Sequence, residues 1–341
     1  RMVMAPMTRN RADTNGIPST AMATYYQQRA SAGLIVTESS PISLEGVGYP
    51  CTPGIYTDQQ VVGWSRVVDS VRSAGGRIFL QLQHCGRISH PSLQPNGAAP
   101  VAPSPLRPSG QAVTYSGMQD FVVPRALETG EIRGIVEQFQ HAAEMAKRAG
   151  FDGVEVHGAN GYLIDQFLRD GSNHRSDAYG GVASNRMRLL NEILDAVCEV
   201  WPSSRVGVRL SPENSFNSMS DSDPRAHFEF FAVELSRRRL VYIHVLEGDM
   251  MTKMSKLDYR GLRSKFGGAY IANNGYHFER AHATILSGSA DLIAFGTPFL
   301  ANPDLVRRYQ EKLPLNAPDP ATFYGGGETG YTDYPSWRRF P

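Results

Sequence analysis

The chain has 341 residues, with 34 Lys and Arg against 33 Asp and Glu, and a formal net charge of +1. This near-neutral balance excludes proteins that bind nucleic acid or an anionic membrane through a strongly basic surface, and 41% hydrophobic residues exclude a disordered chain. The length fits either two ordinary domains or one large α/β barrel, and 33 Gly and 22 Pro predict many short, tight turns.

No apolar run approaches the ~20 residues that a membrane helix needs, and the N-terminus lacks a signal-peptide pattern. We therefore expect a cytoplasmic protein. Cys51, Cys85 and Cys198 are too widely spaced for a metal pair or a disulfide framework, and they predict free thiols. The chain begins with Arg1, so we expect further N-terminal sequence before it. The oligomeric state, monomer or dimer, stays open.

The chain alternates short β-branched runs with longer segments of helical periodicity. A strand at 2–6 is followed by a helix at 21–32, and a strand at 34–38 by a helix that begins after Thr57 and ends at Gly75. The next strand, 78–82, precedes a helix that ends at Gly150, and the strand at 154–157 precedes a helix carrying Leu189 to Val197. Strands at 206–210, 241–246, 269–272 and 292–295, each followed by a plausible helix, complete the series.

Eight strand–helix units in one continuous chain predict an α/β fold, a (β/α)8 TIM barrel forming a single domain over residues 1–341. A doubly wound open sheet is the alternative, and the first strand is not followed by the Gly-rich turn that such sheets use for nucleotides. The connection at 84–130 is unusually long and rich in Pro. Because it leaves the carboxyl end of its strand, we expect an insertion that caps the active site.

Active sites of such barrels lie where the strands end. The polar groups predicted there include Gln81, His157, Asn160, Tyr162 and Arg209. They form neither a paired-carboxylate set nor a cluster of metal ligands, so we expect no metal. An organic cofactor that carries a phosphate, with hydride or proton chemistry, is favoured over metal hydrolysis or glycoside cleavage.

Several motifs occur together in collinear order, from Met2 to about Trp337. They are Ala5-Pro6-Met7-Thr8-Arg9, Gln81-Leu82 with His84 to Arg87, His157-Gly-Ala-Asn160-Gly-Tyr162, Asn173 to Arg175, Tyr179-Gly-Gly181, Phe295-Gly296 and Phe323-Tyr324-Gly. In this combination the chain resembles the Old Yellow Enzyme family of flavin-dependent ene-reductases, and its C-terminal segment resembles the bacterial and cyanobacterial branch.

The resemblance implies FMN as cofactor and NADPH, or NADH, as reductant. The cofactor-binding residues that it implies are Pro6, Met7, Thr8, Ser39, Gln81, Arg209, Asn274, Gly275, Gly296 and Thr297. Thr8 would meet the flavin C4 carbonyl, Gln81 the pyrimidine edge and Arg209 the N1 and O2 region, with the last four residues around the phosphate.

The resemblance also implies the catalytic residues. His157 and Asn160 would bind the carbonyl or nitro oxygen of an activated alkene, and Tyr162 would protonate the carbon next to it after hydride transfer from flavin N5. Phenolic ligands would occupy the same place. Tyr49 and Tyr324 would line the substrate side, and the two half-reactions would follow a ping-pong order.

Two positions depart from the family pattern. Gln83 stands where many relatives carry Trp on the substrate side, which predicts a larger and wetter pocket. Thr297 stands where many relatives carry Arg, so the phosphate would depend on backbone N–H groups and a hydroxyl.

Two other functions are alternatives, the first being another FMN barrel enzyme, such as a dehydrogenase or a dienoyl-CoA reductase. An iron–sulfur dienoyl-CoA reductase needs a cysteine cluster, which three scattered cysteines do not supply. A degenerate barrel that binds flavin or phenols with little turnover is compatible with Gln83 and Thr297, but the complete set of His157, Asn160, Tyr162 and Arg209 argues against it.

Overall fold

A computed structural model describes residues 1–337. Eight parallel strands form a closed barrel in the order β1-β12-β11-β10-β9-β8-β3-β2. The predicted (β/α)8 barrel is confirmed, and the strand order leaves no open edge that a doubly wound sheet would have. The barrel strands are β1 (Met2–Met4), β2 (Leu34–Pro41), β3 (Ile78–Gln83), β8 (Gly153–Gly158), β9 (Val206–Leu210), β10 (Tyr242–Leu246), β11 (Ala269–Asn273) and β12 (Leu292–Phe295).

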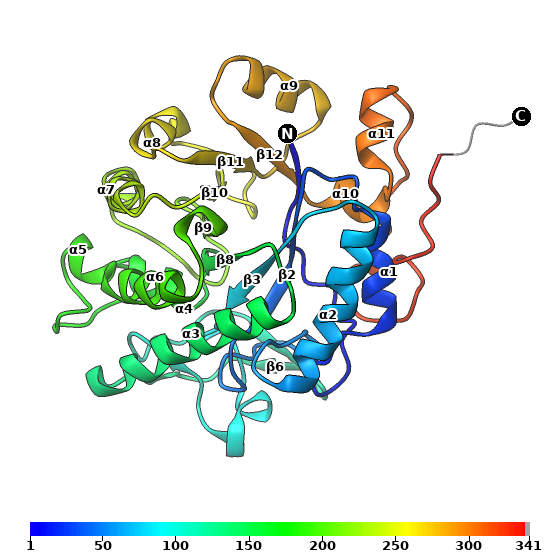
Figure 1. Cartoon of the computed structure of the whole chain (residues 1–341). Coiled ribbons are helices and arrows are strands. Elements are labelled where there is room, and N and C mark those ends of the chain that lie inside the picture. Colours follow the sequence, from blue (N-terminus) through cyan, green and yellow to red (C-terminus); the bar gives the residue numbers. More distant parts are fainter. Residues whose placement is uncertain (338–341) are drawn as a thin grey trace, which may run out of the picture.

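Helices surround the barrel (Figure 1). They are α1 (Thr20–Gln28), α2 (Asp58–Ser73), α3 (Ile132–Arg148), α4 (Leu163–Leu168), α5 (Ala183–Arg186), α6 (Arg188–Val200), α7 (Pro224–Arg237), α8 (Tyr259–Lys265), α9 (Phe278–Leu286), α10 (Thr297–Ala301) and α11 (Leu305–Gln310). Helix α2 shows how sequence sets these elements. Thr57 and Gln60 form a capping box at its start, as the predicted N-cap requires, and its apolar stripe is buried.

Element boundaries differ from the prediction where burial hides the pattern. The predicted strand 34–38 continues to Pro41, and the predicted helix 21–32 ends at Gln28. Helix α4 was not predicted, because all six of its residues are buried and a short helix without an exposed face has no amphipathic period.

Buried apolar residues, two aromatic rings among them, fill the barrel below its mouth. Phe79 and Tyr242 stack with ring centroids 6.1 Å apart inside a cluster of buried residues from several strands. Gly153 and Gly207 face these rings, and a Cβ at either position would lie within 2.4 Å of a ring carbon. The barrel is therefore a packed core at this level, which confines any ligand to its carboxyl-terminal mouth.

Residues 84–130 leave β3 and contain four short strands. β4 (Val101–Ala102) pairs in parallel with β7 (Arg125–Ala126), and β5 (Gln111–Thr114) forms an antiparallel hairpin with β6 (Gly117–Asp120). The hairpin brings Val113, Thr114 and Tyr115 to the mouth of the barrel. The role of this segment as a cap remains a prediction.

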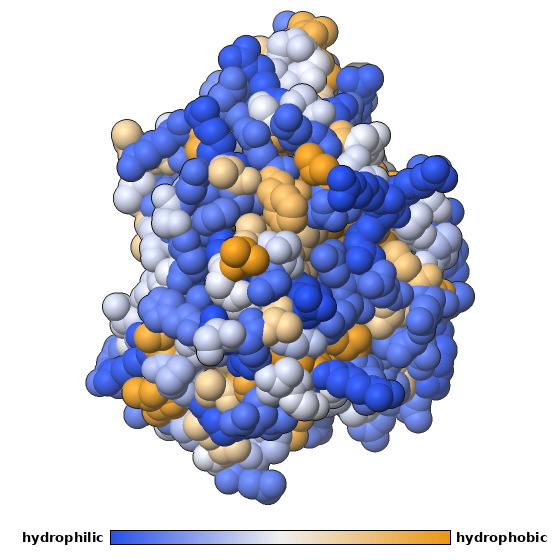
Figure 2. Space-filling model, turned by 90° about the vertical axis from the view of Figure 1, so that its left-hand side faces the viewer, coloured by the Kyte–Doolittle hydropathy of each residue, from blue (hydrophilic) through white to orange (hydrophobic). Residues whose placement is uncertain are grey.

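Polar side chains dominate the face that carries α5 and α7, and apolar residues there form scattered patches (Figure 2). Among the described residues, no helix combines the length and the apolar character that spanning a membrane requires.

Candidate active site

A cavity of about 1010 Å³ opens at the carboxyl ends of the barrel strands. This volume is at the upper end of the range of ~300–1,000 Å³ typical of small-molecule sites. All ten predicted cofactor-binding residues line it, together with Tyr49, His157, Asn160, Tyr162 and Tyr324. Segments at 5–8, 157–162, 273–276 and 294–298 meet here because parallel strands end on the same side of the barrel.

Gln83 is the one predicted site residue outside the cavity lining. Its side chain is buried at the end of β3, where Nε2 lies 2.8 Å from Cys85 Sγ. Burial raises the pKa of the Cys85 thiol to about 12, so this thiol stays protonated. A direct contact between Gln83 and substrate therefore remains a prediction.

A layer of buried polar side chains separates the cavity from the aromatic core. Ser39 Oγ donates to Gln81 Oε1 over 2.7 Å, and Gln81 Nε2 donates to Glu155 Oε1 over 2.6 Å. The other carboxylate oxygen, Oε2, lies 3.0 Å from Nδ1 of His244, whose Nε2 lies 3.1 Å from Arg209 Nη1. Arg209 Nη2 donates to Asn273 Oδ1 over 2.9 Å. The network fixes the orientation of both Gln81 and Arg209.

The charges of this layer compensate one another. Burial disfavours the charged form of Glu155, but the nearby His244 and Arg209 and the hydrogen bond from Gln81 outweigh it and lower the pKa of this carboxyl. Burial likewise lowers the pKa of Arg209, and the charge of Glu155 opposes that shift. A buried carboxylate therefore stabilises the guanidinium beneath the cavity.

His157 is the next inward-facing residue of β8 after Glu155. Burial and the charge of Arg209 lower the pKa of His157 to about 3, so its ring is neutral near pH 7. The backbone N–H of Ala159 donates to Nδ1 over 3.3 Å. The proton of the neutral ring is therefore on Nε2, which makes that nitrogen a hydrogen-bond donor.

Tyr162 directly precedes α4, and its side chain contacts both His157 and Tyr49. Its ring meets the His157 ring edge-on at a centroid distance of 5.1 Å, and its Oη lies 3.1 Å from Tyr49 Oη. Burial raises the pKa of Tyr162 well above its usual 10, and the neighbouring Tyr49 hydroxyl raises it further. The phenol is thus held in the protonated form that an acid requires.

The ends of the two late strands form the opposite part of the cavity. Asn274 and Gly275 both have positive φ, of 90° and 68°, and Asn274 Nδ2 donates to the backbone oxygen of Glu247 over 2.8 Å. Gly296 and Thr297 lead into α10. The turn backbones and the Thr297 hydroxyl are the groups that commonly surround a phosphate in this fold.

The donor set fits a flavin mononucleotide. The cavity has the size for a small-molecule ligand, amide and hydroxyl groups on one side and the turns of β11 and β12 on the other. Arg209 Nε is buried without a hydrogen-bond partner in residues 1–337, beside the cavity that this side chain lines. A bound acceptor at this place would satisfy it.

The sequence did not indicate the residues whose hydrogen bonds fix the predicted site residues in place. Glu155 lies two residues before the predicted His157 on β8, and this two-residue period is the signal that could have found it. His244 lies on β10, which carries no predicted residue, and Asn273 directly precedes the predicted Asn274. Arg9 was quoted only as part of a motif. Its guanidinium donates to the backbone oxygens of Phe323 and Gly330 over 2.8 Å, and this holds the segment with Tyr324 against the cavity.

One cluster has the composition of a metal site. Asp170, Asp221 and His227 bring one ligand atom each within 4.8 Å of one another. Asp170 accepts hydrogen bonds from Ser222, and Asp221 Oδ1 lies 2.6 Å from His227 Nδ1, so the cluster is explained by its own contacts.

Comparison with known proteins gives the class. The sequence model of the NADH:flavin oxidoreductase / NADH oxidase family matches residues 1–316. The chain is 45% identical over 340 residues to a probable flavin mononucleotide-dependent alkene reductase of Leishmania infantum, covering 98% of this chain and 93% of the relative. It is 43% identical over 344 residues to 12-oxophytodienoate reductase 1 of Oryza sativa subsp. japonica, with 98% and 89% covered.

Comparison with solved structures indicates the same class of protein. Morphinone reductase superposes with a TM-score of 0.96 at 46% identity, covering 99% of this chain and 92% of that one. The old yellow enzyme homologue from Zymomonas mobilis superposes with a TM-score of 0.95 at 43% identity, with 98% and 95% covered. The chain belongs to the NADH:flavin oxidoreductase family and, within it, to the Old Yellow Enzyme group of FMN-dependent oxidoreductases, as its motifs predicted.

Proposed function

We propose that the protein is an ene-reductase that uses NADPH or NADH to reduce the activated C=C bond of α,β-unsaturated carbonyl or nitro compounds. The observation that carries this proposal is that His157, Asn160 and Tyr162 line one cavity with the predicted flavin ligands. The similarity to a named alkene reductase supports it, as does a solved complex of morphinone reductase with tetrahydroNAD at 47% identity.

The predicted ligands form two groups, one that would bind the ring system of FMN and one that would bind its phosphate. Thr8, Gln81 and Arg209 would bind the ring system, with the backbone of Pro6 and Met7 and the Ser39 hydroxyl beside them. Asn274, Gly275, Gly296 and Thr297 would bind the phosphate. When bound, FMN accepts a hydride from the reduced nicotinamide and supplies one to the alkene. Arg209, compensated by Glu155, would stabilise negative charge at its end of the cavity.

The chain's own residues would polarise and protonate the substrate. Two neutral donors, Nε2 of His157 and Nδ2 of Asn160, would bind the carbonyl or nitro oxygen on which negative charge develops. The Tyr162 hydroxyl would deliver a proton to the α-carbon, and the Tyr49 hydroxyl, 3.1 Å away, would return a proton to the Tyr162 phenolate. Tyr324 would line the outer side of the pocket. Phenolic compounds would bind as competitors because their oxygen meets the same donors.

Reduced nicotinamides are abundant in the cytoplasm, and we propose that the enzyme works there. A binding protein with little turnover is the second candidate that the sequence left open. The placement of the Tyr162 hydroxyl beside the two proposed oxygen-binding residues, His157 and Asn160, favours the enzyme, because simple ligand storage does not require an acid at that position.

The test is an anaerobic titration of the purified protein. We expect a yellow protein with flavin absorbance that is bleached by NADPH or NADH and regains its colour when 2-cyclohexenone or a nitroalkene is added. Bleaching without recovery by either acceptor would leave a nicotinamide-oxidising flavoprotein and reject the alkene reductase. A colourless protein that takes up no added FMN would reject the cofactor itself.

A further inference from the structure

The backbone of Asn160, the residue proposed to donate a hydrogen bond to the substrate oxygen, has an unusual conformation. Its φ is 60°, and Gly161 follows with φ of 77°. The left-handed region costs a side chain about 1 kcal/mol or more, and Asn tolerates it better than most residues. The segment after β9 packs against this turn, since a Cβ on Gly161 would lie 2.7 Å from Asn217 Cβ and 2.8 Å from Met219 Cγ.

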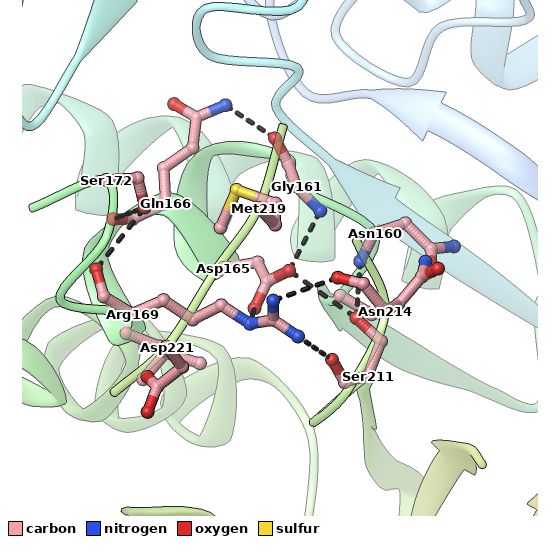
Figure 3. A network of polar contacts seen from close by, with 12 residues as sticks. Asn160, Gly161, Asp165, Gln166, Arg169, Ser172, Ser211, Asn214, Met219 and Asp221 are labelled. Carbon is pink, nitrogen blue, oxygen red and sulfur yellow. Dashed lines mark hydrogen bonds and ion pairs between the residues drawn. The ribbon is translucent and has the colours of Figure 1, made fainter. Parts of the chain in front are cut away.

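Three of the four polar atoms of Asn160 have partners in that segment. The backbone N–H donates to Ser211 Oγ over 2.8 Å, and the backbone oxygen accepts from Asn217 Nδ2 over 2.8 Å. The side-chain Oδ1 accepts from Asn214 Nδ2 over 3.0 Å. Within residues 1–337, Nδ2 of Asn160 donates to no group, and Asn160 lines the cavity. Figure 3 shows this arrangement around Asn160, Ser211 and Asn214.

The backbone N–H of Met250 determines the orientation of two side-chain amides, that of Asn214 and, through it, that of Asn160. The N–H of Met250 can only donate, and it lies 3.4 Å from Asn214 Oδ1. The oxygen of Asn214 therefore faces Met250, and its NH2 group faces Asn160. The oxygen of Asn160 must then face Asn214, which leaves the NH2 group of Asn160 for the cavity.

A buried ion pair holds Asn214 in place. Arg169, at the end of α4, lies 3.3 Å from Asp165 Oδ1 and donates to the backbone oxygens of Asn214, over 2.9 Å, and Ser211. Asp165 Oδ2 accepts from the Gly161 N–H over 2.8 Å (Figure 3). Both charged side chains are 1% exposed or less. The pair thus ties the turn of Asn160 and the segment of Asn214 to the same helix.

We propose that Asn214 is a positioning residue that fixes the amide of Asn160 with its NH2 group toward the cavity. Asn160 is then a dedicated donor, and the site selects ligands that present an oxygen acceptor over ligands that present a donor. This inference rests on the proposed function, because it takes Asn160 as a group that binds the substrate oxygen.

The test is Asn214→Asp, a substitution of nearly equal shape that replaces the NH2 group by an oxygen. The new carboxylate cannot donate to Asn160, whose amide is expected to turn and present its oxygen to the cavity. The measurement is stopped-flow reoxidation of the NADPH- or NADH-reduced holoenzyme by 2-cyclohexenone, a neutral probe that the added charge affects little. We expect the apparent dissociation constant of the enone to rise on the order of 10- to 100-fold, since an unpaired acceptor faces its oxygen.

Asn160→Gly supplies the second arm, because Gly removes the side chain and still adopts the positive φ. If Asn214 acts through Asn160, the double variant binds the enone as Asn160→Gly alone does, within about twofold. Additive losses would overturn the positioning role and leave the proposed function intact. An unchanged constant in Asn160→Gly would remove Asn160 from oxygen binding and the inference with it.

Asn214→Ala keeps the inference testable if the charged variant does not fold. Here the Asn160 amide is free to turn rather than forced to, so we expect a smaller rise, about twofold to fivefold. A loss in Asn214→Ala as large as in Asn160→Gly, with normal FMN content, would contradict the proposal, because removing the fixing group alone should not abolish the donor.

Discussion

The hydroxyl oxygens of Tyr49 and Tyr162 lie 3.1 Å apart, and the Tyr162 ring stands edge-on to that of His157. The proposed acid thereby lies next to a proposed oxygen-binding group, with a second hydroxyl beside it. Tyr162→Phe removes the proton donor without changing the ring, and we expect alkene reduction to slow by about 10²- to 10³-fold. Bleaching of the flavin by NADPH or NADH should change little.

The control for this variant is Tyr309→Phe, on α11 outside the cavity. It should leave both half-reactions at the wild-type rate. Stopped-flow absorbance of each half-reaction supplies the measurement. If Tyr162→Phe slows both half-reactions equally, Tyr162 shapes the site rather than donating a proton.

A neutral His157 has a consequence for pH dependence. Its pKa falls from 6.5 in a free side chain to about 3 in the folded protein, so the ring is uncharged throughout the range from pH 5 to 8. We expect the reoxidation rate with 2-cyclohexenone to show no inflection near pH 6.5. An inflection there that disappears in His157→Asn would show that the ring titrates normally.

The same shift affects stability with a defined sign. Between pH 3 and 6.5 the unfolded chain binds a proton at His157 that the folded chain does not. This contribution to stability is fully present above pH 6.5 and is lost as the pH falls toward 3. Urea midpoints of wild type should therefore fall more steeply on acidification than those of His157→Asn. Parallel midpoints would contradict the assignment.

The buried layer under the cavity predicts a stability effect. Glu155→Gln removes the buried carboxylate that contacts His244, and with it the negative charge that compensates Arg209, so we expect a loss of about 3 kcal/mol in the free energy of unfolding. Glu137→Gln is the matched control, because Glu137 pairs with Arg133 on the surface of α3 at 61% side-chain exposure. The control should change stability by less than about 0.5 kcal/mol. Equal effects in denaturant titrations would argue against a buried compensating charge.

We expect the residue at position 297 to affect how tightly the FMN phosphate is bound. Thr297→Arg adds a charged donor at the start of α10, and we expect FMN to dissociate about fivefold more slowly. Ala283→Arg adds the same charge to the exposed surface of α9 and should not change the rate. The release of flavin fluorescence after dilution measures both. An unchanged rate in Thr297→Arg would mean that the backbone groups already saturate the site.

The barrel and much of its site could be predicted because their signals are local. Strand runs, Gly at helix ends and the motif around His157 each occupy a few consecutive residues. The predicted residues line one cavity because the carboxyl ends of all barrel strands lie at the same end of the barrel.

The supporting residues could not be predicted in the same way. Glu155 reaches Gln81 and His244 across three strands, and Asn214 reaches Asn160 from the next βα connection. These contacts join residues 54 to 89 positions apart and depend on side-chain rotamers, so no local sequence pattern indicates which residues meet. Gln83 illustrates the same limit, because its turn toward Cys85 follows from local packing rather than from its place at a strand end.

Product analysis with a nicotinamide deuterated at C4 tests the central claim most directly. The protein, the deuterated cofactor and 2-cyclohexenone are incubated without oxygen, and the product is examined by mass spectrometry and NMR. An ene-reductase yields cyclohexanone with deuterium on the β-carbon. An allylic alcohol, or cofactor oxidation without any reduced alkene, would contradict the proposed function.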